Sequence, residues 1–167
     1  MAAPIYTAQS RMPTTVEEKA PVKVLATLEN GREWKSGDEV VINNIKYTVV
    51  EGGKSTTTIE NVTAADYYYA AYDFGKGNIE NTYLNVEVPA IQGPAITMIQ
   101  PMVASNRNTN LVFKNLLGTL RLAVEGSGTI TRVVLSSLDR AIAGQGSANM
   151  DFAGAPMLEL AGDGSRS

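Results

Sequence analysis

Few residues of this chain could carry out chemistry, because it contains neither histidine nor cysteine. Histidine is the commonest general base, and cysteine supplies thiolate nucleophiles, thiolate metal ligands and disulfides. No serine has a lysine in S-x-x-K spacing. Two pairs of carboxylates are adjacent, Glu17-Glu18 and Asp38-Glu39. Neighbouring residues of a strand point to opposite faces, so we expect solvated surface acids and predict that the protein is not an enzyme.

Three short motifs match only part of a ligand-binding pattern. Gly75-Lys76-Gly77 lacks the full G-x-x-x-x-G-K-[ST] spacing of a phosphate loop, and we interpret it as a turn. Gly162-Asp163-Gly164 offers one carboxylate, whereas calcium needs several oxygen ligands. Asn61-Val62-Thr63 is a formal glycosylation sequon, a pattern with many false positives. The sequence therefore predicts no cofactor and no metal site.

Aromatic residues are the best candidates for a binding surface. Tyr67, Tyr68, Tyr69 and Tyr72 lie within six residues, and exposed tyrosines are favoured at protein and carbohydrate interfaces. We take Tyr67, Tyr68 and Tyr72 as a candidate interaction surface for proteins or glycans. The alternative is that two of the tyrosines pack in the core and the others cover a sheet face. Trp34 is expected to be a core anchor and not a sugar platform.

Composition limits the classes of partner. The 167 residues are 44% hydrophobic and carry a net charge of −3, which suits one globular domain with its own core. Lysine and arginine are scattered singly, so we expect no binding of nucleic acid. No apolar stretch approaches the ~20 residues that a membrane-spanning helix needs. Residues 1–19 show no basic start and no apolar core, so no signal peptide is visible.

The patterning predicts a flexible N-terminal arm over residues 1–19, a β-domain over 20–161 and a polar tail over 162–167. No segment sustains a helical period with a cap and a stop. Short alternating runs bounded by turn residues favour an all-β sandwich. The expected strands are 22–27, 39–42, 45–50, 56–62, 67–72, 83–88, 111–114 and 157–161.

The segments between these strands are expected to be turns and loops. Asn30-Gly31 ends the first strand, and Asn43-Asn44 is a plausible two-residue hairpin turn. Residues 74–81 and 144–154 are expected loops. Three prolines predict an edge strand or an irregular segment between the strand at 83–88 and the one at 111–114: Pro89, Pro94 and Pro101.

Residues 119–135 carry the clearest alternation in the chain. Leu120, Leu122 and Val124 fall on one face of a strand, Gly126 to Gly128 supply a turn, and residues 130–135 form a second alternating run. We therefore predict a β-hairpin here, following the strand at 111–114. Its apolar face should be core, together with Phe113, and Arg121 should face solvent.

Five segments, in order, resemble the fimbrillin-like (Mfa-like) family of Bacteroidetes, whose members include pilins and cell-surface lipoproteins. They are WKSGDEV at 34–40 with Tyr47 following, YYYAAY at 67–72, VPAIQ at 88–92, PMVA at 101–104 and FKNLLGTL at 113–120. The family-motif positions, which we expect to be structural, are Trp34, Gly37, Asp38, Tyr69, Pro101, Phe113, Asn115 and Gly118.

The resemblance implies a transthyretin-like antiparallel β-sandwich of about seven strands, corresponding to the family's N-terminal domain. It implies a structural or adhesive protein of a pilus or cell surface, without a cofactor, that binds other subunits or copies of itself. Family pilins polymerise by donor-strand exchange, a form of β-augmentation. This chain has no lipobox cysteine and no second β-domain, so donor and acceptor residues are not assigned.

Two other functions remain open from the sequence. The same fold could serve a phage virion protein, in a capsid decoration or a fibre, which would explain a methionine start without a visible signal peptide. It could also serve as a carbohydrate-binding module that uses the tyrosines or Trp34. The expected location is the cell surface or fimbrium for a processed chain, and the virion for a phage protein.

Overall fold

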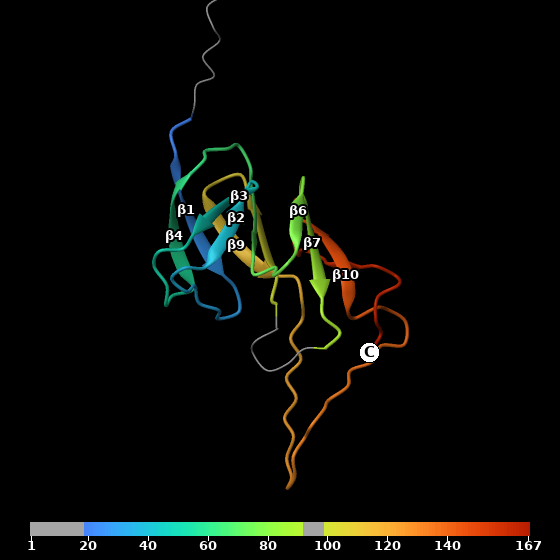
Figure 1. Ribbon diagram of the computed structural model, residues 1–167. Coiled ribbons are helices and arrows are strands. Elements are labelled where there is room, and N and C mark those ends of the chain that lie inside the picture. Colours follow the sequence, from blue (N-terminus) through green and yellow to red (C-terminus); the bar gives the residue numbers. More distant parts are fainter. Residues whose placement is uncertain (1–18, 92–98) are drawn as a thin grey trace, which may run out of the picture.

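The computed structural model describes residues 19–91 and 99–167, and every regular element within these ranges is a β-strand (Figure 1). Residues 1–18 of the predicted N-terminal arm, which include the Glu17-Glu18 pair, lie outside the described residues, and so does Pro94. The strands are β1 (Val22–Leu28), β2 (Glu39–Ile42), β3 (Ile45–Thr48), β4 (Thr56–Val62), β5 (Tyr68–Tyr72), β6 (Asn78–Glu80), β7 (Tyr83–Val88), β8 (Met102–Asn106), β9 (Asn110–Asn115), β10 (Gly144–Asn149) and β11 (Glu159–Leu160).

Seven strands form one curled sheet in the order β3-β2-β5-β8-β9-β1-β4. All neighbours are antiparallel except β1 and β9, which are parallel. The sheet curls until its two edge strands approach one another, and the Tyr47 hydroxyl of β3 accepts a hydrogen bond from the Thr63 N–H, just beyond β4, at 3.1 Å. The sheet is therefore nearly a barrel, and its inner face encloses the main hydrophobic core.

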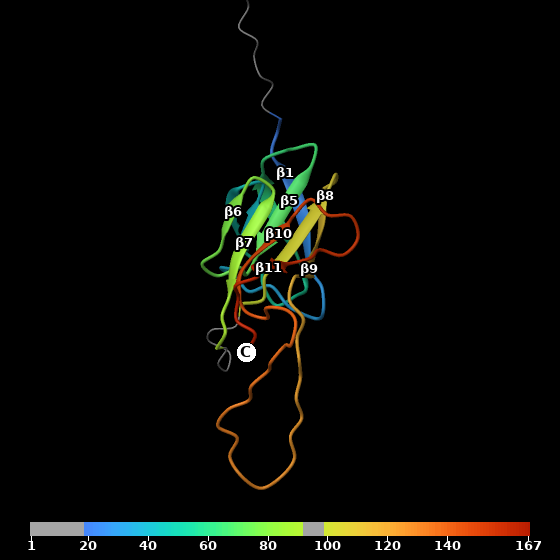
Figure 2. The same cartoon turned by 90° about the vertical axis from the view of Figure 1, so that its right-hand side faces the viewer.

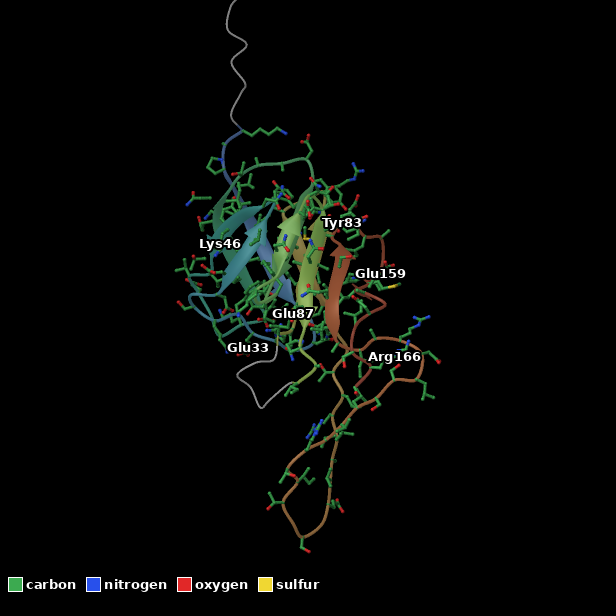
Figure 3. The ribbon with its side chains drawn as sticks, turned by 45° about the vertical axis from the view of Figure 1, so that its right-hand side comes forward. Glu33, Lys46, Tyr83, Glu87, Glu159 and Arg166 are labelled. Carbon is green, nitrogen blue, oxygen red and sulfur yellow. The ribbon has the colours of Figure 1, made fainter. Side chains whose placement is uncertain are left out.

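The other four strands form a small sheet, β11-β10-β7-β6, that lies against the outside of the curled sheet (Figure 2). Alternate residues of β7 are buried, and these side chains meet Ala71 of β5 and Val103 of β8 in a second core. The residues of β7 between them face outward, as Tyr83 and Glu87 do in Figure 3. Strand β5 and the first three residues of β8 are consequently buried on both faces, which explains why they carry aromatic or aliphatic side chains at every position.

The prediction of an all-β fold is confirmed for the described residues. Strand β4 has the predicted bounds, and the β2–β3 hairpin forms where it was expected. Its turn residues Asn43 and Asn44 have φ of 48° and 64°, as a two-residue hairpin turn requires. Asn30 and Gly31 also have positive φ after β1. Local turn chemistry thus located these boundaries correctly.

Three strands form where the sequence predicted loops or irregular structure. Strand β8 is central in the curled sheet, because Pro101 precedes its first residue and so removes no ladder hydrogen bond. Strands β6 and β10 lie in predicted loops, and each pairs with β7 along its whole length. In β10, a Cβ atom at Gly146 would lie 3.0 Å from the Glu159 carbonyl oxygen, so glycine permits the pairing with β11. Pairing with distant segments overrides weak strand propensity here.

The predicted hairpin at 119–135 is not formed. Residues 116–143 contain no strand, and Leu120, Leu122 and Val124 are more than half exposed and not core. The physical reason is that the chain beyond β9 has no strand beside it. Asn115 pairs with Met102, the first residue of β8, and Phe113 pairs with Leu28, the last residue of β1. Beyond Asn115 the chain runs past the end of the sheet and projects from the body as a long loop (Figures 1 and 2).

The C-terminal residues return to the base of this loop. The Ile142 N–H donates to the Ser165 carbonyl at 2.9 Å, and the Ser137 N–H donates to the Arg166 carbonyl at 2.9 Å. The segment predicted as a polar tail therefore holds the loop where it rejoins β10.

Candidate functional site

Trp34 and Phe113 lie in the centre of the main core. Both are fully buried, and their rings meet edge to face with centroids 5.5 Å apart. The Trp34 ring also packs on Tyr72 at 4.6 Å, and its Nε1–H donates to the Ala26 carbonyl at 3.0 Å. A buried indole with its one donor satisfied is a packing element and offers no face to a ligand.

Asp38 ties this aromatic cluster to the turn before β2. Its Oδ2 accepts hydrogen bonds from the Tyr72 hydroxyl at 2.7 Å and from the Lys35 backbone N–H at 2.8 Å. Gly37 has φ of 91°, and its N–H donates to the Val49 carbonyl at 2.8 Å. The WKSGD segment thus forms a turn locked onto the core by its carboxylate.

Tyr72 should make the stability of the protein sensitive to alkaline pH. Burial, the hydrogen bond to Asp38 and the Asp38 charge raise the Tyr72 pKa well above its usual range, and the nearby Arg32 opposes the shift only in part. A raised pKa means that the folded state holds the phenolic proton more tightly than the unfolded chain. The contribution is therefore complete below pH ~10, where unfolded tyrosine ionises, and is lost as the pH rises towards the folded pKa.

Urea denaturation at a series of alkaline pH values measures this effect, with Tyr72→Phe as the comparison. We expect the stability of the wild type to decline more steeply above pH ~10 than that of the variant. Equal slopes for the two proteins would contradict the assignment to Tyr72.

The remaining family-motif positions lie around the end of β9. Pro101 is buried, and its carbonyl accepts from the Leu116 N–H at 2.9 Å. Asn115 is half-buried, and its Oδ1 atom is buried without a hydrogen bond. Gly118 is exposed, and a Cβ there would meet nothing within 4 Å.

The candidate surface of three tyrosines divides between the core and the exterior. Tyr68 and Tyr72 are only 3% and 7% exposed, because alternate residues of β5 point into the curled sheet. Tyr67, at the entry to β5, is half-buried at the surface, and so is Tyr69. Their rings pack together with centroids 4.7 Å apart. The accessible aromatic pair is therefore Tyr67 and Tyr69.

Asn43 fixes the position of this pair. Its Nδ2 donates to the Tyr67 carbonyl at 3.0 Å, and its Oδ1 accepts from the Tyr69 N–H at 2.8 Å. Its own N–H donates to the Tyr69 carbonyl at 2.8 Å. The tight β2–β3 turn is thus hydrogen-bonded to the start of β5. The Asn-Asn dipeptide predicted the turn, whereas its hydrogen bonds to the tyrosines could be seen only in the tertiary structure.

The tyrosine pair lines a hollow of about 230 Å³ between the two sheets. Four segments meet there: the β2–β3 turn, the start of β5, the β6–β7 turn and the residue after β10. We call it the tyrosine hollow, and its lining is Asn43, Asn44, Tyr67, Tyr69, Asn81, Thr82 and Met150. Sequence reasoning assigned no binding role to five of these residues, Asn43, Asn44, Asn81, Thr82 and Met150. The only signal for the first four is their position at turns between alternating runs.

Two charged side chains contact Tyr67, one at its hydroxyl and one at its ring. Its hydroxyl donates to Asp151 Oδ1 at 3.2 Å, and the Arg107 guanidinium lies 5.9 Å from the ring centroid. Burial raises the pKa of the neighbouring Tyr69, with smaller contributions from Asp151 and Tyr67. The Tyr69 phenol therefore remains a neutral hydrogen-bonding group at physiological pH.

The projecting loop is the other distinctive surface. We call residues 118–138 the apolar arm, because eight of the fifteen exposed large hydrophobic residues of the described chain lie in it. Its side chains stand clear of the two sheets (Figure 3). They are Leu120, Leu122, Val124, Ile130, Val133, Val134, Leu135 and Leu138, each at least 56% exposed.

The described residues contain no cluster of three or more metal-ligating acidic, histidine or cysteine side chains. Within the same ranges, no helix has the length and apolar character to cross a membrane. Comparisons of the chain with models of known families, with curated proteins and with solved structures gave no match. What the geometry defines is an all-β protein with an exposed apolar arm at one end and a tyrosine-lined hollow at the other.

Proposed function

We propose that the protein is a non-enzymatic structural or adhesive module of a cell-surface or pilus-type assembly, acting through protein–protein contacts. The observation that carries the proposal is the apolar arm. Contiguous exposed apolar surface on a soluble domain marks an interaction site, because water favours its burial. The arm is also long and lacks strand partners of its own, so a neighbouring subunit can supply them by β-augmentation.

Asn115 supports the idea that the base of the arm changes its surroundings on assembly. Its buried Oδ1 is unpartnered, and leaving a buried acceptor unsatisfied costs about 1–3 kcal/mol. The residue lies at the last position of β9, three residues before the apolar arm begins. A second chain that orders the arm could provide the missing donor.

We further propose that the fold is the transthyretin-like sandwich of the fimbrillin-like family. The main core around Trp34 and Phe113 and the turn that Asp38 ties to it support this assignment. These are positions at which the sequence resembles that family. The binding partner that we infer for the apolar arm is a second copy of this chain.

The test is self-association of the whole chain, measured by sedimentation over a range of concentrations. Serine at Leu120, Leu122 and Val124 removes about 3–5 kcal/mol of burial in an assembled arm, so association should weaken about a hundredfold or more. Stability of the monomer should change little, because these side chains are more than half exposed.

The matched control replaces Thr119, Arg121 and Glu125, which are exposed on the other side of the same run, by serine. These changes should leave association nearly unaltered. A wild-type chain that stays monomeric at all concentrations would overturn the proposal, as would equal weakening by the two triple variants.

A further inference from the structure

The tyrosine hollow has a composition that suits a specific class of small ligand. None of its seven lining residues carries a formal charge, and they offer three carboxamides, two phenols and one aliphatic hydroxyl. Such groups pair with hydroxyls both as donors and as acceptors. A charged ligand would find no opposite charge in the lining itself, so the hollow suits a neutral, hydroxyl-rich molecule.

Several polar groups of the hollow are free to bind. The side-chain amide of Asn43 holds the tyrosine pair, because it donates to the Tyr67 carbonyl and accepts from the Tyr69 N–H. Asn44 and Asn81 are exposed, and within the described residues their side-chain amides make no hydrogen bond. They belong to two different hairpin turns, β2–β3 and β6–β7, and both line the hollow. A ligand in the hollow can therefore be bound by groups from both turns.

The hollow is also preorganised. Asn43 anchors the tyrosine pair through three hydrogen bonds, and the Met150 N–H donates to the Thr82 carbonyl at 2.7 Å, which joins β10 to the β6–β7 turn. Groups that are already fixed lose little entropy on binding. Two neighbouring tyrosine rings supply apolar surface next to these polar groups, the combination that suits the two faces of a sugar ring.

We propose that the tyrosine hollow binds a neutral saccharide, one terminal sugar ring of a glycan, through Tyr67, Tyr69, Asn44 and Asn81. Its volume of about 230 Å³ is below the ~300–1,000 Å³ of pockets for drug-sized ligands, so a single ring is the fitting size. An extended peptide suits the hollow less well. Peptides bind through apolar pockets or free strand edges, whereas the Tyr69 main chain is already bonded on both groups to Asn43.

The experiment is an NMR titration of the whole ¹⁵N-labelled chain with the methyl glycosides of neutral hexoses and N-acetylhexosamines. We expect at least one sugar to shift the amide signals of residues 43–44, 67–69 and 81–82 together. Affinity for a single ring held by a few hydrogen bonds should be in the millimolar range, about −4 kcal/mol.

The decisive variant is Asn44→Gly with Asn81→Gly. Both residues have positive φ, 64° and 55°, so glycine removes the amides and leaves the backbone unstrained. Affinity should fall at least about tenfold. The matched control is Asn30→Gly, an exposed residue with φ of 62° that does not line the hollow, and it should bind as the wild type does.

Three results would overturn the proposal: no sugar shifts these signals, the double glycine variant binds equally well, or an uncharged tyrosine- and leucine-containing peptide competes at the same site with higher affinity. None of them bears on the arm. Strand registers place Tyr68 and Ile42 at one end of the curled sheet and Met102 with Asn115 at the other, so the hollow and the arm lie at opposite ends.

Discussion

Trp34→Ala is expected to remove about 3–5 kcal/mol from the free energy of unfolding, the usual loss when a buried large aromatic is truncated. Trp34 is fully buried between Tyr72 and Phe113, and its loss also leaves the Ala26 carbonyl without the indole donor. Domains of this size are stable by only about 5–15 kcal/mol, so the variant should lose a large part of its stability.

Urea denaturation followed by circular dichroism measures this loss, because the variant lacks the only tryptophan and gives no tryptophan fluorescence. Trp34→Phe keeps an aromatic ring but not the hydrogen bond, and should fall between the wild type and Trp34→Ala. Tyr83→Ala is the surface control: Tyr83 is 49% exposed on the outer face of the small sheet (Figure 3), and its replacement should cost much less. A loss below about 1 kcal/mol for Trp34→Ala would contradict the central role of the indole.

Asp38→Ala should be the next most damaging change, with an expected loss of about 2–3 kcal/mol. The substitution removes the acceptor of both the Tyr72 hydroxyl and the Lys35 N–H. Tyr72 is 7% exposed, so its hydroxyl would be left nearly buried without a partner. Unpaired buried donors cost more than an absent interaction.

A double-mutant cycle with Tyr72→Phe tests this explanation directly. The sum of the stability losses of the two single variants should exceed the loss of the double variant by about 1 kcal/mol or more, because both substitutions remove the same hydrogen bond. Glu39→Ala is the control, since the Glu39–Lys46 pair at 3.0 Å is exposed and such pairs contribute little. Additive losses at Asp38 and Tyr72 would show that the hydrogen bond is not what stabilises the turn.

Strand positions could be predicted best where the local pattern was strong. Strand β4 and the β2–β3 hairpin follow from alternation and from asparagines able to adopt positive φ. Strand predictions from the sequence pattern were wrong where pairing with a neighbouring strand, and not the strand propensity of the residues, decides whether a strand forms. Gly144–Asn149 has a poor strand sequence but pairs with every residue of β7, and residues 119–135 have a strong pattern but no neighbour. A strand is a cooperative pair, so alternation without a partner is not sufficient.

The candidate sites show the same division. A cluster of tyrosines was evident from the sequence, but which of them reach the surface was not. The period of two separates Tyr67 and Tyr69 from Tyr68, yet it does not say which set faces the core, and β5 has a core on each face. The remaining members of the tyrosine hollow come from turns up to about a hundred residues apart, which only the packing of the two sheets brings together.

By itself, the sequence determined an all-β chain without histidine or cysteine, the turn of the β2–β3 hairpin and the central tryptophan, because these depend on residue type and short-range spacing. Tertiary structure decided which strands pair, which tyrosines are accessible, where the hollow lies and that the most regular apolar alternation remains exposed. These features depend on whether a distant segment supplies a hydrogen-bonding edge or a surface to bury against. For the alternating run at residues 119–135 within the apolar arm, no strand of the described chain supplies such an edge, and we propose that a second copy supplies it.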